Sequence, residues 1–349
     1  MAAADRLQTI ALARQALLHE RSTATVPALA PWLQRGWQRC QALGLEPGQR
    51  VGFDVVSAAR MRRVQEENRP LVQAARPVLA ELVRAMGSIG YFAILTNAEG
   101  IVIDVHGPVD RGDRRADVIA RVGVDLSERA VGTTAISAAL TELQPVWLHR
   151  GEHFFDDTSV YSCAGAPVFG PDGRCAGMLD LTGVEVTERP ALKHLVRRSA
   201  RSIENSWLLT TPHALTLRLN WPGNQPGDDS DGLLTLDADG RISGANPTAR
   251  QMLSLDVGDS SAHASDVFAM PWENLFDAAQ RNDGFYEVPL WSGLRLQTQA
   301  HRAGAALTGN TTMRSSGKAL RDVETELIRQ AVVKAKGNVA EAARALGIS

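Results

Sequence analysis

The 349-residue sequence has only three cysteines, Cys40, Cys163 and Cys175, which form neither a CxxC pair nor an even-numbered set. This scarcity argues against the disulfide framework of a small secreted domain and fits a reducing compartment. The first twenty residues carry charges throughout, so they lack the uncharged apolar core of a signal peptide or a membrane span. These absences predict a cytoplasmic protein that has no membrane partner.

Neither sign of charge dominates the sequence. It has 37 lysine and arginine residues against 39 aspartate and glutamate residues, which gives a net charge of −2 at pH 7. Any contact with nucleic acid must therefore come from a local basic patch. The hydrophobic fraction of 44% is high enough to build cores, and the length predicts two or three compact units joined by linkers.

Several chemical signatures are missing as well. No GxxxxGK[ST] phosphate loop occurs, because the only Gly-Lys pair, Gly317-Lys318, is not followed by serine or threonine. His149 and His153 lie four residues apart near two aspartates, but Gly151 between them argues against one helix that would turn both towards a metal. No nucleophile, base and orienting residue stand together at a recognisable spacing. The sequence therefore predicts no ATP, no metal, no cofactor and no enzyme activity.

The central stretch, residues 122–183, predicts half of a compact α/β fold. Small residues over 132–140 favour a helix that packs close to a sheet, with Thr133 or Thr134 as its N-terminal cap. Residues 162–181 contain two apolar runs separated by Gly-Pro-Asp-Gly, whose residues suit a tight turn. This order predicts a β-hairpin.

The flanking segments complete the expected fold. Two β-rich runs within 91–105 predict an opening hairpin, and an amphipathic helix over 187–209 closes the unit. Residues 57–86 are strongly helical, with Pro70 and Pro77 as expected breaks or kinks. An intramolecular cover for the sheet and a dimer interface are both open for this helical segment.

Four short motifs in this part of the chain carry a resemblance. They are ERAVGTTAISAA over 128–139, EHF over 152–154, CAGAP over 163–167, and a DG turn at 172–173 before GMLD over 177–180. Together they resemble the GAF domain of bacterial transcription regulators related to the acetoin catabolism regulator. The resemblance implies a sensor domain that binds a small metabolite, and long flanking helices that form a dimer interface.

A pocket for a small effector needs an apolar lining with a few placed polar groups. The candidate lining residues are Thr133, Thr134, Trp147, Phe154, Phe155, Tyr161 and Cys163. The two threonines would offer hydroxyl and amide donors at the start of the predicted helix. Cys163 and Cys175 are expected to be buried, inert thiols.

The C-terminal half begins with a turn-rich linker, because residues 220–231 are dense in Pro, Gly, Asn and Asp. Residues 232–249 then read as a strand, an Asp-Gly turn, a strand and a helix led by Asn-Pro. This order resembles the start of a PAS domain. Residues 256–283 look irregular, and strands return over 285–290 and 294–300, so we expect a degenerate PAS-like domain.

The last segment, residues 318–349, contains two amphipathic helix patterns divided by Gly337-Asn338. With Ala342-Ala343 it resembles the Fis-type helix-turn-helix, which implies DNA binding. The predicted DNA contacts are Lys336, Asn338, Arg344 and Ser349. The recognition helix of that motif would follow the last of these residues, so the motif is incomplete in this sequence. A truncated copy is favoured over a natural product without specific DNA recognition.

The sequence thus predicts an α+β multidomain protein with a GAF-like α/β sensor, a PAS-like α/β domain and an incomplete all-α helix-turn-helix. The expected boundaries are an N-terminal helical region (1–86), the GAF-like sensor (87–210), a linker (211–229), the degenerate PAS-like domain (230–300), a second linker (301–317) and the truncated Fis-type segment (318–349).

The function that these parts imply is that of a homodimeric transcriptional regulator, which binds a small-molecule effector through the sensor and DNA through the C-terminal helices. Many regulators of the resembling family also carry an ATPase module that contacts the sigma-54 form of RNA polymerase. The missing phosphate loop removes that activity from the expectation. The alternative function is that of a sensor or interaction protein that dimerises with a regulator and modulates it without reading DNA.

Overall fold

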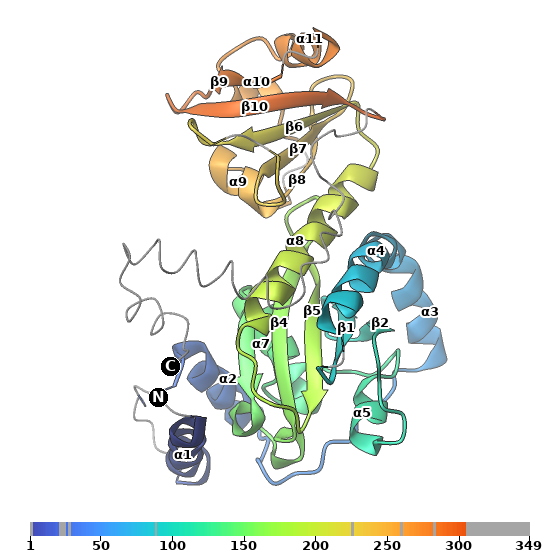
Figure 1. Ribbon diagram of the computed structural model, residues 1–349, viewed down its shortest axis with the longest axis vertical. Coiled ribbons are helices and arrows are strands. Elements are labelled where there is room, and N and C mark those ends of the chain that lie inside the picture. The colour runs from blue at the N-terminus through green and yellow to red at the C-terminus, as the bar shows by residue number, and fades with distance from the viewer. Residues whose placement is uncertain are drawn as a thin grey trace.

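The structure, a computed structural model, describes residues 3–20, 26, 29–87, 89–224, 227–258, 261–281 and 284–304. Two antiparallel five-stranded sheets organise these residues. Figure 1 shows helix α8 (Leu192–Thr210) running from the first sheet to the second. The described part of the chain is therefore a mixed α/β structure, in agreement with the α/β part of the predicted fold class, and the predicted all-α segment over 318–349 lies outside the described residues.

The first sheet has the strand order β2-β1-β5-β4-β3. Its strands are β1 (Tyr91–Asn97), β2 (Val102–His106), β3 (Val146–His149), β4 (Tyr161–Phe169) and β5 (Cys175–Val184). Both predicted hairpins are confirmed, since β1 pairs with β2 and β4 pairs with β5. The second pairing sets Cys163 opposite Thr182 on neighbouring strands of the sheet.

Helices cover both faces of the first sheet. One face packs against α1 (Ala3–Arg14), η1 (Gln15–His19), α2 (Pro31–Ala42), α5 (Arg114–Ile119), α6 (Glu128–Val131) and α7 (Ala135–Glu142). The other face packs against α3 (Ala58–Glu67), α4 (Arg69–Met86) and α8. Strand alternation separates the two cores, so that Cys163 and Met178 lie on the first face and Ala164 and Leu179 on the second.

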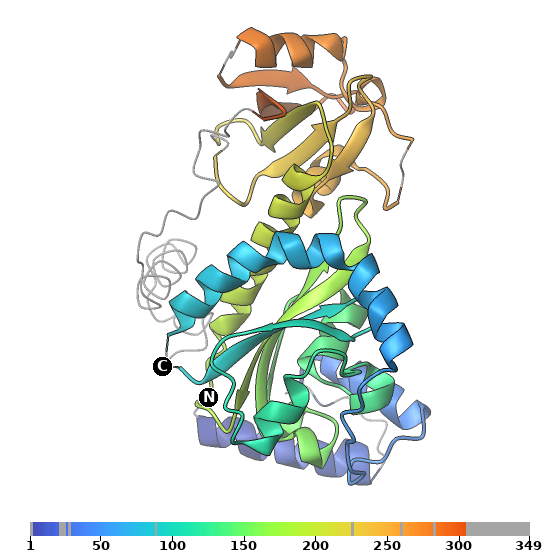
Figure 2. The same ribbon diagram turned by 90° about the vertical axis from the view of Figure 1, so that its right-hand side faces the viewer.

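The helical segment that was predicted over 57–86 is two helices, which form an arch beside the first sheet in Figure 2. The predicted break at Pro70 is confirmed, because α3 ends at Glu67 and α4 begins at Arg69. Pro77 lies inside α4, which continues without a break to Met86. α4 packs along α8, so this segment covers the sheet within the chain.

The second sheet has the order β8-β7-β6-β10-β9. Its strands are β6 (Leu215–Asn220), β7 (Gly232–Leu236), β8 (Ile242–Ala245), β9 (Tyr286–Pro289) and β10 (Arg295–Arg302). The prediction that residues 211–229 form a linker is wrong at β6, which occupies the centre of this sheet. The leucines of β6 alternate along the strand and are fully buried in the core, which is the period-two pattern of a strand.

Helices α9 (Pro247–Leu253), α10 (Ala264–Val267) and α11 (Glu273–Arg281) pack on one face of the second sheet. The Asn246 side chain caps α9 by accepting a hydrogen bond from the Ala249 amide, with Pro247 in the first turn, as predicted. The prediction that residues 256–283 are irregular is wrong, since this stretch contains α10 and α11. Short helices give too few turns for a clear sequence period.

The β4–β5 turn joins the two sheets. The carbonyl oxygen of Pro171 accepts hydrogen bonds from the Ala245 amide, at 3.0 Å, and from the Arg250 guanidinium, at 2.9 Å. The Gly258 amide donates to the carbonyl oxygen of Asp172 at 2.9 Å. From α8, the side-chain oxygen of Asn205 accepts from Asn246 at 2.9 Å. The hairpin and α8 therefore both anchor the second sheet.

Candidate functional site

A small cavity lies between α7 and the first sheet. It is lined by Phe53, Ile119, Leu126, Val131, Thr134, Ala135, Ile136, His153, Thr158, Tyr161, Cys163 and Thr182. The space open to the centre of a water-sized sphere is about 10 Å³, which is room for about one water molecule. A guest of several heavy atoms therefore fits only if the surrounding side chains shift.

Three of the seven predicted ligand-binding residues line this cavity: Thr134, Tyr161 and Cys163. Thr134 also caps α7, as predicted, by accepting a hydrogen bond from the Ser137 amide at 3.3 Å. Tyr161 and Cys163 reach the cavity from alternate positions of β4, which place both side chains on the same face of the sheet.

The other predicted lining residues lie elsewhere. Thr133 packs against α2, where its hydroxyl oxygen is 3.2 Å from the Cys40 sulfur. Phe154 and Phe155 belong to the same core as the cavity residues and contact each other edge to face, but they do not line the cavity. Trp147 lies on the opposite face of the sheet, because its neighbours Val146 and Leu148 occupy the cavity face of β3.

The sequence reasoning missed most of the apolar lining, which comes from distant segments such as Phe53, Ile119 and Leu126. Only the tertiary fold brings these residues to α7, so no local pattern could have found them. It favoured a structural or pocket-lining role for His153 over a metal site, but it did not include this residue in the set of candidates. A signal was present for this residue, since it stands inside the EHF motif that carried part of the family resemblance.

His153 is fully buried beside the cavity. Its Nδ1 atom lies 2.9 Å from the carbonyl oxygen of Arg150, and its Nε2 atom has no hydrogen-bond partner among the described residues. Burial lowers the pKa of His153 to about 4, so the imidazole is neutral at pH 7. An unpaired buried polar atom is costly and rare in native structures, so it needs an explanation such as a functional role or a bound partner.

The N-terminal helices hold the loop that carries His153. Arg14, which is buried, donates to the carbonyl oxygens of Gly151, at 3.0 Å, and His153, at 2.5 Å. The indole of Trp37 on α2 donates to the carbonyl oxygen of Glu152 at 2.9 Å. These contacts fix the backbone on both sides of the histidine, so residues far away in the sequence determine where its ring lies.

A buried polar chain lies beside the cavity on β4 and β5. The Thr182 hydroxyl donates to a carboxylate oxygen of Asp180, and the Cys163 sulfur is 3.5 Å from the same hydroxyl oxygen. The second carboxylate oxygen of Asp180 has no partner in the part of the chain that the structure describes. Burial raises the pKa of Asp180 to about 7 and the pKa of the Cys163 thiol well above its usual value. The thiol therefore stays protonated and unreactive.

Among the residues described, no three His, Cys, Asp or Glu side chains are grouped so that they could hold a metal ion. The Nδ1 atom of His149 lies 2.7 Å from the Ser162 hydroxyl oxygen, whereas the Nδ1 atom of His153 lies 2.9 Å from the carbonyl oxygen of Arg150, so the two histidines have different partners. In the same described ranges, no helix is both long and apolar enough to cross a membrane.

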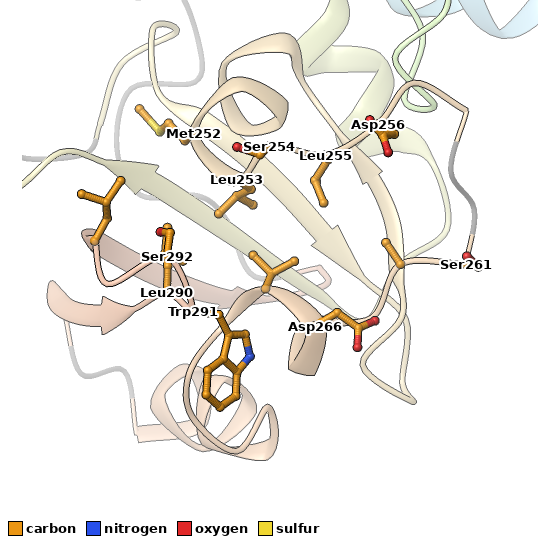
Figure 3. A pocket seen from close by; sticks show the side chains of 13 residues that line it. Met252, Leu253, Ser254, Leu255, Asp256, Ser261, Asp266, Leu290, Trp291 and Ser292 are labelled. Atoms are coloured by element: carbon orange, nitrogen blue, oxygen red, sulfur yellow. The ribbon is translucent and has the colours of Figure 1, made fainter.

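A second, wider cavity of about 380 Å³ lies beside the second sheet (Figure 3). Its lining comes from the end of α9, the segment after it, α10 and the β9–β10 turn. Trp291 at its edge is 68% exposed, and Asp256 and Asp266 add carboxylates to a mainly aliphatic lining. This hollow is open to solvent at that edge, unlike the cavity at His153, where all polar lining groups are buried.

The four predicted DNA contacts, Lys336, Asn338, Arg344 and Ser349, lie outside the described residues, as does most of the predicted linker over 301–317. The structure therefore does not test the predicted DNA contacts, which stay predictions.

Two protein families match this chain, and together they cover most of its length. The family described as "MimR, N-terminal domain" matches residues 10–205, and the family described as "Bacterial regulatory protein, Fis family" matches residues 319–349. The acetoin catabolism regulatory protein of Cupriavidus necator is 31% identical over 283 residues, which are 78% of this chain and 41% of that protein.

The propane 2-monooxygenase operon transcriptional activator MimR of Mycolicibacterium goodii is 29% identical over 180 residues, which are 51% of this chain and 30% of that protein. The chain thus spans less than half of the length of either relative. Among solved structures, the E. coli DhaR(N)-DhaL complex is similar with a TM-score of 0.48 at 16% identity, over 78% of this chain and 99% of that chain.

An α/β N-terminal part that precedes a Fis-family segment is the layout of a bacterial regulatory protein. The chain belongs to the MimR N-terminal domain family, whose match covers more than half of it. The predicted resemblance to regulators related to the acetoin catabolism regulator is thereby confirmed. The names of these relatives describe control of transcription, in agreement with the prediction that the chain is not an enzyme.

Proposed function

We propose that the protein is an effector-responsive transcriptional regulator of the cytoplasm that acts as a homodimer. The first sheet with its helices is a GAF-like sensor that binds a small uncharged molecule in the cavity at His153. The second sheet with α9 to α11 is a PAS-like unit that receives the signal. Residues 318–349 supply the contacts with DNA.

The observation that carries the sensing role is the unpaired, fully buried Nε2 atom of His153 at an enclosed cavity. A buried acceptor without a partner costs about 1–3 kcal/mol, and a bound guest would recover this energy. The described residues that line the cavity are apolar or bear a hydroxyl, apart from Cys163 and the neutral His153, and none of them is Asp, Glu, Lys or Arg, which favours an uncharged guest. Its small volume favours a guest of few heavy atoms.

The names of two relatives mention molecules as small as the guest that this cavity favours. One is named for acetoin, a four-carbon hydroxyketone, and the other for the propane 2-monooxygenase operon. We therefore infer that the effector of this chain is a small oxygenated molecule of three or four carbons.

The β4–β5 hairpin offers the path from the cavity to the second sheet. Cys163 and Thr182 on these strands line the cavity, and the turn between the strands hydrogen-bonds to Ala245, Arg250 and Gly258. A guest that spreads β4 and β5 at the cavity would tilt this turn against the second sheet. The hairpin belongs to the first sheet and its turn is hydrogen-bonded to the second unit. It can therefore couple the two units without a further element.

The sensing role predicts that small oxygenated molecules stabilise the chain against heat. Acetoin and propan-2-ol at about 100 times their dissociation constants are expected to add about 2.7 kcal/mol to the free energy of unfolding, which differential scanning fluorimetry detects. The Val131→Ile variant adds a methyl group to the cavity and should lose most of this gain. The same substitution at Val78, on the opposite face of the sheet, is the matched control and should keep it. Equal stabilisation of both variants would place the binding site elsewhere.

The regulatory role predicts that the chain binds the DNA upstream of its own coding region. Fluorescence anisotropy at 50 and 200 mM salt should show binding that beats unrelated DNA and weakens about tenfold or more at the higher salt, because cationic contacts release counterions from the phosphates. The Lys336→Ala and Arg344→Ala variants should each reduce this salt dependence. Binding no tighter than to random DNA would favour the alternative of a protein that modulates a regulator without reading DNA.

A further inference from the structure

The two ring nitrogens of His153 have different chemical states. Nδ1 lies 2.9 Å from the carbonyl oxygen of Arg150, and a carbonyl oxygen only accepts hydrogen bonds, so Nδ1 carries the hydrogen. In the neutral ring Nε2 is then an acceptor with a free lone pair. The described residues provide no donor for it, although the atom is buried.

The surroundings keep the ring in this neutral form. Burial is the largest cause of the lowered pKa, and the Arg14 cation acts in the same direction, whereas the hydrogen bond to the Arg150 carbonyl oxygen opposes them. Arg14 donates its hydrogen bonds to backbone carbonyls of the His153 loop and to Asp156, not to the ring. Nε2 therefore remains an acceptor across the physiological pH range.

The hydroxyl groups around the cavity are mostly committed as donors to other atoms. The Thr158 hydroxyl donates to the carbonyl oxygen of Phe155 at 2.9 Å, and the Tyr161 hydroxyl donates to the carbonyl oxygen of Arg115 at 2.8 Å. The Thr182 hydroxyl donates to Asp180. Three of the four lining residues that bear a hydroxyl, all except Thr134, therefore have no hydrogen to offer a guest. The cavity is richer in acceptors than in donors.

We propose that this cavity selects small uncharged alcohols, whose hydroxyl group donates a hydrogen bond to Nε2 of His153. The inference rests on the proposed sensing function and assigns the chemical class of its effector. A ketone of the same size would set its oxygen, an acceptor, against an acceptor. An amine cation or a carboxylate would carry a charge into a site whose described lining residues include no Asp, Glu, Lys or Arg side chain.

Two matched pairs of probes test this class: propan-2-ol against propan-2-one, and butan-2-ol against butan-2-one. Within each pair the carbon skeleton is the same, and the ketone lacks the hydroxyl hydrogen that the alcohol donates. Dissociation constants from ligand-observed NMR on the unmodified chain are expected to favour each alcohol by about tenfold, the effect of one added hydrogen bond. The His153→Phe variant keeps a flat ring without the acceptor, and its preference should fall to about onefold.

A spectroscopic readout separates recognition from mere support of the fold. The ¹⁵N signal of the unprotonated Nε2 should move on addition of propan-2-ol and stay in place with propan-2-one. The His153→Phe spectrum identifies this signal among the eight histidines. If that variant does not fold, the ratio of the ketone and alcohol dissociation constants of the unmodified chain still tests the proposed preference for alcohols.

The outcomes distinguish the two levels of the proposal. Equal affinity for alcohol and ketone, both lost in Val131→Ile, would overturn the alcohol class and leave the sensing cavity standing. Absence of binding by all four probes would overturn the sensing cavity and the alcohol class together.

Discussion

Replacing Gly177 with alanine is expected to prevent stable folding of the first sheet. Gly177 stands on β5 between β1 and β4, opposite Asn97 and Val168. An added Cβ atom would lie 2.0 Å from the carbonyl oxygen of Thr96 and 3.2 Å from a methyl carbon of Leu71. The first contact is with backbone inside a paired strand, so no rotamer change relieves it.

The expected cost of Gly177→Ala is at least about 4 kcal/mol, which is a large part of the 5–15 kcal/mol that stabilises a typical protein. Denaturant unfolding monitored by tryptophan fluorescence would show a lowered midpoint, or the variant would be recovered only as aggregate. Gly48→Ala is the matched control, because its Cβ atom meets nothing within 4 Å, and it should change stability by less than about 1 kcal/mol. A midpoint for Gly177→Ala equal to that of the control would contradict the packing described for β1 and β5.

Local sequence signals predicted most of the first sheet. The two hairpins, the Thr134 cap of α7 and the boundary at Pro70 all depend on residues close together in the chain, where turn chemistry and periodicity act directly. The failures at β6 and α11 have different causes. β6 adjoins turn-rich sequence, although its alternating leucines were a sufficient signal for a strand. α11 is a short helix, with too few turns for a clear sequence period.

The candidate site was harder to predict than the fold. Tyr161 and Cys163 could be found because alternate residues of one strand share a face. Trp147 could not be assigned to a face without the register of β3, since the same alternation places it on either side of the sheet. The orientation of His153 depends on Arg14 and Trp37, more than a hundred residues away, so no local pattern contains it.

Replacing Glu204 with glutamine is expected to stabilise the protein at pH 8 and to leave its stability at pH 5 nearly unchanged. Glu204 lies on the buried side of α8, where a side-chain oxygen accepts a hydrogen bond from the Phe169 amide at 3.0 Å. Burial raises the pKa of Glu204 to about 8, although the Phe169 amide and the Arg201 cation favour the charged form. Glutamine keeps the acceptor for Phe169 and has no charge to bury.

The direction of this pH dependence of stability follows from how tightly the folded and unfolded states bind the proton of Glu204. A carboxyl group whose pKa is higher in the folded state than in the unfolded state binds its proton more tightly when folded, so it stabilises the fold least at high pH. Above the unfolded pKa of about 4.5, each pH unit removes about 1.4 kcal/mol until the folded pKa is reached. Between pH 5 and pH 8 the advantage of Glu204→Gln should therefore grow by up to about 4 kcal/mol.

Urea unfolding of the unmodified chain and of Glu204→Gln at pH 5, 6.5 and 8 measures this growth. Asp180, whose pKa is raised to about 7, adds a dependence of the same sign to both proteins, so the difference between them isolates Glu204. Glu67→Gln on α3 removes the same charge from an exposed position and is the matched control for loss of a surface carboxylate. A constant difference for Glu204→Gln would mean that its carboxyl group is ionised in the folded protein. The contact between β4 and α8 would then rest on a charged acceptor instead of a neutral one.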